Sequence, residues 1–107
     1  MTRKFIHTSP FRSAWQLMQL DDDALNALEN TLLLAPEVGD MIEGTGGARK
    51  MRIQFAGHGK SGGGRVIYFD NGAVIYLITA YPKSVQEDLT PLQKKRIHEL
   101  TRQFRKE

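Results

Sequence analysis

Two apolar runs joined by a short turn signal constrain the fold of this 107-residue chain more than any other feature. Arg65–Phe69 and Ala73–Tyr81 are rich in β-branched and aromatic side chains, which favour β-strands. Asp70-Asn71-Gly72 lies between them. Asn and Gly tolerate the positive φ angles of a type I′ turn, so the segment predicts a β-hairpin.

The hairpin also predicts strand position and register. The second run, AVIYLITAY, is apolar on both faces, which indicates a central strand. A tight turn at Asn71-Gly72 predicts the cross-strand pairs Phe69–Val74, Ile67–Tyr76 and Arg65–Ile78.

A third strand is predicted from Lys50 to Phe55. Lys50, Arg52 and Gln54 alternate there with apolar residues, which is the pattern of a strand with one wet and one buried face. Lys50 and Arg52 are therefore expected on the face away from the core. Gly57–Gly64 is predicted to be a loop.

The remaining elements are an N-terminal strand and three helices. Arg3–Thr8 predicts a short edge strand that Pro10 ends. Ser13 is predicted to cap a short first helix. The aspartates at 21–23 favour the start of a second helix. Leu33 and Leu34 are expected to broaden the apolar stripe of this helix, and Pro36 to end it. Thr90, Pro91 and Gln93 predict a capped C-terminal helix.

This order, β-α-α-β-β-β-α, predicts one α+β domain over residues 1–107, with the helices on one face of a largely antiparallel sheet. No apolar run approaches the ~18 residues that span a bilayer, so we expect no membrane segment. The first fifteen residues lack the apolar core of a secretory signal, and cysteine is absent, so we expect a cytoplasmic protein.

Charges are segregated along the chain. Seven acidic residues and no lysine or arginine lie between Ser13 and Ala48. The next segment, Gly44–Tyr68, holds eight of the ten glycines and five cations without an acidic residue. Cations beside permissive backbone are typical of a surface that receives a polyphosphate. A solvated charged shell is the alternative.

A cationic sheet face indicates nucleic acid, because lysine and arginine neutralise phosphates. Lys50, Arg52, Lys60, Arg65 and Lys83 can converge across neighbouring strands, and Tyr81 or Tyr68 can stack on a splayed base. The same residue types can cleave RNA without metal. A lysine can take the 2′-hydroxyl proton, and arginines can stabilise the phosphorane.

Other motifs in the sequence give weaker indications of function. Gly57-x-Gly59-x-x-Gly62 matches a dinucleotide-binding fingerprint, and Gly59-Lys60-Ser61 matches the end of a P-loop. Both motifs bind phosphate at the start of a helix, but here a predicted strand follows instead. The three histidines lack metal-ligand spacing. We therefore expect no metal and no cofactor. His58 lies in the basic glycine loop, where it is expected to contact a ligand or to act as a proton shuttle.

The sequence resembles the RelE-type toxins of bacterial type II toxin–antitoxin modules, and most closely the HigB branch. The resemblance rests on three segments: Gly39-Asp-x-Ile-x-Gly-Thr-Gly-Gly-x-Arg-Lys-x-Arg52, Gly59-Lys-x-Gly-Gly-x-Arg-Val-Ile-Tyr68 and Tyr81-x-Lys-x-x-x-x-Asp-Leu89. In the third segment this chain has Ser84-Val85 where close relatives tend to have Asn-Glu.

The resemblance implies a small RelE-like domain that binds the ribosomal A site, cleaves mRNA there without metal, and is held inactive by a cognate antitoxin. It assigns proton transfer to Lys50 or Arg52 and phosphate stabilisation to Arg65 and Lys83, with Arg49 in the same basic strand. The alternatives are an RNA- or ribosome-binding module that does not cleave, and a gyrase-directed ParE-like toxin.

Overall fold

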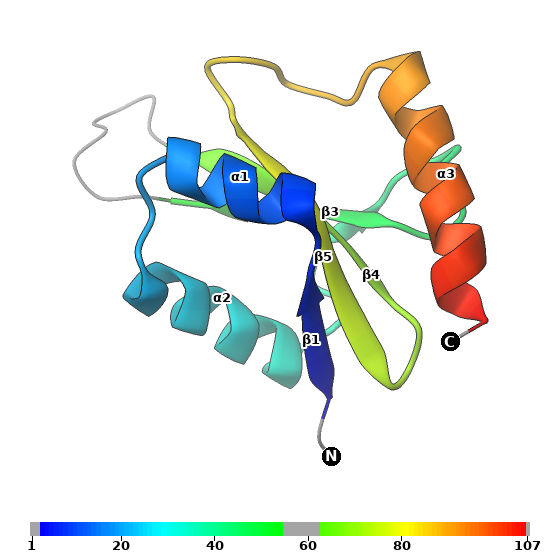
Figure 1. The fold of residues 1–107 in the computed structure, drawn as a ribbon, viewed down its shortest axis with the longest axis horizontal. Helices are drawn as coiled ribbons and strands as arrows, with labels where there is room; N and C mark the ends of the chain where they lie inside the picture. The colour runs from blue at the N-terminus through cyan, green and yellow to red at the C-terminus, as the bar shows by residue number, and fades with distance from the viewer. Residues whose placement is uncertain (1–2, 55–62, 107) are drawn as a thin grey trace.

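The computed structural model describes residues 3–54 and 63–106. Within these ranges five strands form one sheet in the order β1-β5-β4-β3-β2 (Figure 1). β1 pairs with β5 in parallel, and the other neighbours pair antiparallel. The elements are β1 (Lys4–His7), α1 (Ser9–Leu17), α2 (Asp22–Leu34), β2 (Asp40–Met41), β3 (Arg49–Ile53), β4 (Gly64–Asp70), β5 (Val74–Pro82) and α3 (Pro91–Arg105). The predicted α+β class, the edge position of β1 and the interior position of β5 are confirmed.

Helices cover both faces of the sheet, so the prediction that they lie on one face is wrong. α1 and α2 contribute Trp15 and Leu32 to a core that includes Leu77 of β5, whereas α3 contributes Ile97 to a second core that includes Ile78. Figure 1 shows α3 on the opposite side of the sheet from α1 and α2. β4 and β5 are apolar on both faces, and each face needs a layer to exclude water.

The β4–β5 hairpin forms, but its register differs from the prediction. Phe69 pairs with Tyr76 and Arg65 with Tyr81, and a bulge interrupts the ladder between Ile67 and Tyr68. Among the described residues outside glycine, positive φ occurs at Gln19 alone, so Asn71 does not enter the conformation that a type I′ turn requires.

Asn71 serves the turn through its side chain instead. Its Oδ1 atom accepts from the backbone N–H groups of Ala73 and Val74, and its Nδ2 atom donates to the carbonyl oxygen of Phe104 in α3. The residue therefore closes a wider turn and fastens the end of α3 to it. That wider turn shifts the strand pairing from the tight two-residue register.

The first helix begins earlier than predicted. The hydroxyl of Thr8 accepts from the N–H of Phe11 and donates to the carbonyl oxygen of Ile78, so Thr8 caps α1 and ties it to β5. Pro10 lies in the first turn of α1, where a proline costs no hydrogen bond. The proline starts the helix, and Ser13 lies inside it rather than at its cap.

The other two helix starts agree with the sequence. Asp21 caps α2, and Thr90 and Gln93 form the capping box of α3. Leu34 is 88% exposed, so it does not broaden the apolar face of α2 as predicted. No helix in the described ranges is long and apolar enough to cross a bilayer.

The glycines at 44–47 shape a turn that packs on α3. A Cβ atom at Gly46, whose φ is +74°, would lie 2.6 Å from the Oγ1 atom of Thr101. That hydroxyl donates to the carbonyl oxygen of Thr45, and both threonines are fully buried. This turn joins β2, which the sequence analysis missed, to β3. The close approach that these glycines permit is therefore to a helix of the same chain.

Tyr68 links the sheet to the segment after α2. Its side chain is fully buried, and its hydroxyl donates to the carbonyl oxygen of Pro36 and accepts from the N–H of Gly39, at 2.7 and 2.9 Å. Burial raises the pKa of this hydroxyl. A Cβ atom at Gly39 would lie 2.9 Å from the ring, so the pair is closely fitted.

We predict that Tyr68→Phe lowers the free energy of unfolding by about 1–3 kcal/mol, because the buried N–H of Gly39 and the part-buried carbonyl of Pro36 lose their partner. Tyr81→Phe is the matched control. Its hydroxyl makes one long bond, 3.4 Å to the carbonyl oxygen of Glu87, so we expect a loss below about 1 kcal/mol. Urea denaturation of the two variants measures both values, and equal losses would contradict the assignment.

Candidate functional site

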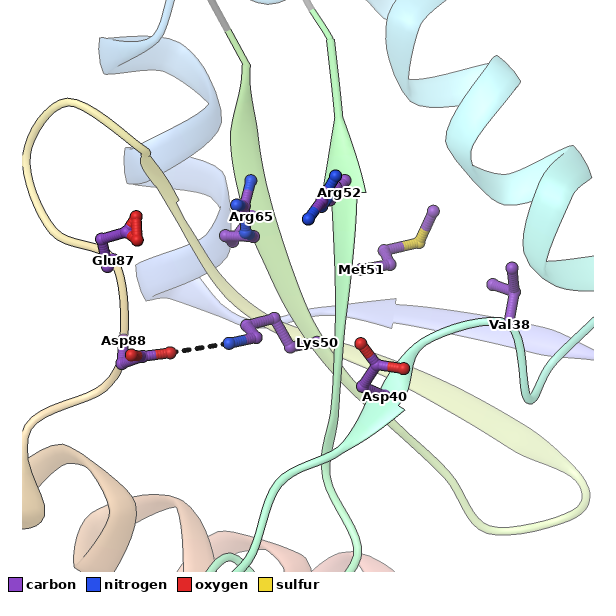
Figure 2. Close-up of a pocket in the computed structure, with 8 residues that line it drawn as sticks. All are labelled: Val38, Asp40, Lys50, Met51, Arg52, Arg65, Glu87 and Asp88. Carbon is purple, nitrogen blue, oxygen red and sulfur yellow. Dashed lines mark hydrogen bonds and ion pairs between the residues drawn. The ribbon is translucent and has the colours of Figure 1, made fainter.

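An open pocket of about 520 Å³ lies between the β3–β4 surface and the segment that precedes α3 (Figure 2). Three cations reach it from the strands: Lys50, Arg52 and Arg65. Acidic side chains reach it from β2 and from the segment between β5 and α3. The complete lining is Val38, Asp40, Lys50, Met51, Arg52, Arg65, Glu87 and Asp88.

Strand pairing brings the cations together. Arg52 lies directly opposite Arg65 in the β3–β4 ladder, and Lys50 lies opposite Ile67. Cross-strand partners share a face of the sheet, and Ile67 belongs to the core under α3. All three cations are therefore on the α3 side of the sheet. Lys50 and Arg52 share a face as predicted, but that face also carries the core under α3, so the prediction that it is the face away from the core is wrong.

The Arg52–Arg65 pair is electrostatically costly. Like charges directly opposite on a sheet destabilise it, whereas an opposite-charge pair would support it. In the ranges 3–54 and 63–106 neither guanidinium forms an ion pair with a carboxylate, and the Nη1 atom of Arg65 donates to the carbonyl oxygen of Gly64. This arrangement suits an external anion between the two side chains.

Lys50 already has a carboxylate partner. Its Nζ atom lies 2.7 Å from the Oδ1 atom of Asp88, and the side chains are 26% and 72% exposed. Figure 2 shows this contact crossing the pocket. The hydrogen bond from Lys50 lowers the pKa of the Asp88 carboxyl, with Lys94 and Arg65 adding to the effect.

The sequence analysis missed the acidic side of the pocket. Asp40 and Asp88 stood within the first and third motif segments without a role, and Glu87 was not considered. One signal was available for Asp88: it lies two residues before Thr90, the predicted cap of a basic helix. Its pairing with Lys50 depends on tertiary placement.

Arg49 and Tyr68 lie apart from the pocket. Arg49 pairs with Tyr68, which belongs to the core under α1 and α2, so alternation places Arg49 on the opposite face from Lys50. Its Nη1 atom donates to the carbonyl oxygens of Glu37 and Gly39. The Tyr68 ring is fully buried, so the prediction that it stacks on a base is wrong.

Tyr81 is also buried, at 6% exposure, in the core under α3. Base stacking at Tyr81 is therefore contradicted in this conformation, because its ring already packs against apolar neighbours. Burial raises the pKa of its hydroxyl, and Asp88 adds to the rise. The group therefore keeps its proton at neutral pH.

Lys83 is exposed just beyond β5 and does not line the pocket. Its N–H donates to the carbonyl oxygen of Gly63, which places it beside the start of β4. His58 and Lys60 lie outside the described residues. Among the residues that the structure does describe, no three His, Cys, Asp or Glu side chains gather in a way that could hold a metal ion.

Comparison with known proteins identifies the fold. No protein-family model matches the sequence. The structure is similar to a double mutant of the E. coli toxin RelE in the free state, with a TM-score of 0.55 and 16% identity over 81% of this chain and 90% of that chain. It is also similar to the E. coli DinJ-YafQ toxin-antitoxin complex, with a TM-score of 0.44 and 13% identity over 82% of this chain and 100% of the matched chain. The RelE-like fold is confirmed.

We predict that the Asp88 carboxyl titrates below the ordinary value of about 3.9 and that Lys50→Met moves its pKa upward. Because the folded-state pKa is lowered, any stability from the pair is present above the ordinary pKa and is lost as pH falls through the folded-state value. Carboxyl ¹³C NMR measures both titrations. Lys95→Met, an exposed change on α3, is the control, and an unchanged Asp88 titration in Lys50→Met would refute the assignment.

Proposed function

We propose that this protein is the toxin of a type II toxin–antitoxin pair, a single domain over residues 1–107 that acts in the cytoplasm as a ribosome-dependent, metal-independent mRNA endonuclease. The observation that carries the proposal is the Arg52–Arg65 pair, two guanidinium groups opposite each other in an open pocket on a RelE fold. The sequence motifs favour the HigB branch.

Each cation has a role in the proposed cleavage. The 2′-oxygen attacks phosphorus as its proton passes to water, the bond from phosphorus to the 5′-oxygen breaks, and the leaving 5′-oxygen takes up a proton. Arg52 and Arg65 stabilise the negative charge on the phosphorane oxygens. Lys50, which lies on the same face of β3 as Arg52, is assigned the transfer of a proton to the leaving 5′-oxygen.

The outer cations extend the RNA path. Lys83 is exposed beside the start of β4 and can contact a phosphate next to the pocket. His58 and Lys60 keep their sequence-based assignments to RNA contact. Arg49, on the other face of β3, serves the fold through its bonds to the segment after α2.

RNA binding without cleavage is the second candidate. Two observations favour it: both candidate stacking tyrosines are buried, and Lys50 is engaged by Asp88. A module of this kind would hold mRNA or the ribosomal A site by its cations and leave the transcript intact.

The proposed protein partner is a cognate antitoxin. DinJ and YafQ form a toxin-antitoxin complex, and the basic pocket here would accept an acidic segment of such a partner. Charge complementarity of this kind speeds association and is screened by salt.

We predict that the wild type arrests growth when it is induced alone and produces new 3′ ends inside codons, detected by primer extension. Arg52→Ala or Arg65→Ala should lower cleavage by about 10²–10³-fold, the usual cost of losing one preorganised donor to transition-state charge. Arg102→Ala on α3 is the control, because Arg102 does not line the pocket and both side chains of its pair with Glu99 are exposed. Equal activity in all three variants would contradict the site.

Lys50→Arg, expressed at the same level as the wild type, separates cleavage from binding. Arginine keeps the charge but gives up a proton far less readily than lysine. Ribosome association with loss of new 3′ ends supports proton transfer by Lys50, whereas full cleavage contradicts it. Growth arrest with intact transcripts and blocked replication would instead indicate a gyrase-directed toxin.

We predict that the antitoxin complex weakens as ionic strength rises, and that the Arg52→Ala/Arg65→Ala double variant shows a smaller salt dependence. Titration calorimetry at low and high salt measures both. An affinity that does not change with salt would indicate apolar docking instead of charge pairing.

A further inference from the structure

The contact between Lys50 and Asp88 joins parts of the chain that are 38 residues apart. The carboxylate approaches the ammonium from the segment before α3 (Figure 2). Arg52 and Arg65 have no such partner in the described part of the chain. One of the three cations of the pocket is therefore neutralised internally, and two are not.

The fold places Asp88 for this contact. Gln86 donates from its Nε2 atom to the carbonyl oxygen of Asp88 and to the Oε1 atom of Gln93. Gln93 belongs to the capping box of α3, where it also accepts from the N–H of Thr90. The helix start thereby fixes the backbone at Asp88, and its side chain is aimed at the strand.

Stability does not account for the pair. Asp88 is 72% exposed, and exposed ion pairs contribute little to folding. The chemistry of the carboxylate is more informative. Its Oδ1 atom lies 2.7 Å from the Nζ atom of Lys50, where an oxygen of a phosphate would bind the same ammonium.

We propose that Asp88 is a displaceable internal anion: it holds Lys50 before RNA binds, and a phosphodiester group of RNA takes its place on the ammonium. The proposal rests on the proposed function. Arg52 and Arg65 hold the phosphate, and one of its oxygens then takes the place of Asp88 on Lys50. Because the tethered carboxylate competes at high effective concentration, an anion that contacts Lys50 alone does not displace it, whereas one that is also held by Arg52 and Arg65 does.

Glu87 provides a matched control. It lines the same pocket, but no ion pair to it is found among the described residues. Asp88→Asn and Glu87→Gln each remove one negative charge from the pocket with little change in shape. A difference between the two variants therefore reports the specific contact with Lys50 and not the net charge.

The test measures binding of a 2′-O-methyl RNA oligonucleotide, which lacks the attacking hydroxyl, by fluorescence anisotropy at fixed salt. We expect Asp88→Asn to bind about two- to fivefold more tightly than Glu87→Gln, the range that one exposed ion pair supports. Equal affinities, or weaker binding by Asp88→Asn, would overturn the proposal. Circular dichroism checks that both variants are folded.

A second measurement follows the wild-type pair itself. The proposal expects the NMR signals of the Lys50 ammonium and the Asp88 carboxyl to shift together when the oligonucleotide binds, whereas a pair that persists in the complex would overturn it. Transcript mapping tests the nuclease activity separately from the anion exchange. Intact transcripts with the expected order of affinities would reject the nuclease and keep the anion exchange.

Discussion

The burial of both faces of β4 and β5 is the constraint on which the rest of the structure depends. Their side chains alternate between two apolar cores, one under α1 and α2 and one under α3. A sheet with two apolar faces needs two covering layers, so the chain must return to the far side after β5. The segment 83–90 makes that crossing, and it carries Asp88 to the pocket.

The site follows from this crossing. β3 lies next to β4, and its cations occupy the α3 side, where the segment 83–90 approaches. Two guanidinium groups in direct opposition and an ammonium bound to a carboxylate form one electrostatic unit. Such a surface costs the isolated fold stability and is suited to an anionic ligand.

Several sequence features that indicate a ligand serve the fold instead. Gly46 admits α3, Tyr68 anchors the segment after α2, and Arg49 caps backbone carbonyls of that same segment. The density of cations along the chain was thus a coarser guide to the site residues than the pairing register of the strands. The register decides which cations share a face of the sheet. It places Lys50, Arg52 and Arg65 on the α3 side and Arg49 on the other side.

The sequence by itself determined the α+β class, the interior position of β5, the starts of α2 and α3 and the shared face of Lys50 and Arg52, because caps and alternation are local properties of the chain. Tertiary structure alone decided the bulged register, the placement of helices on both faces and the Lys50–Asp88 pair. Asn71 illustrates the reason. Its local propensity favours a tight turn, but bonds to the turn backbone and to α3 select another geometry. Contacts between residues far apart in sequence override local preference because they are formed by packing, which no local pattern encodes.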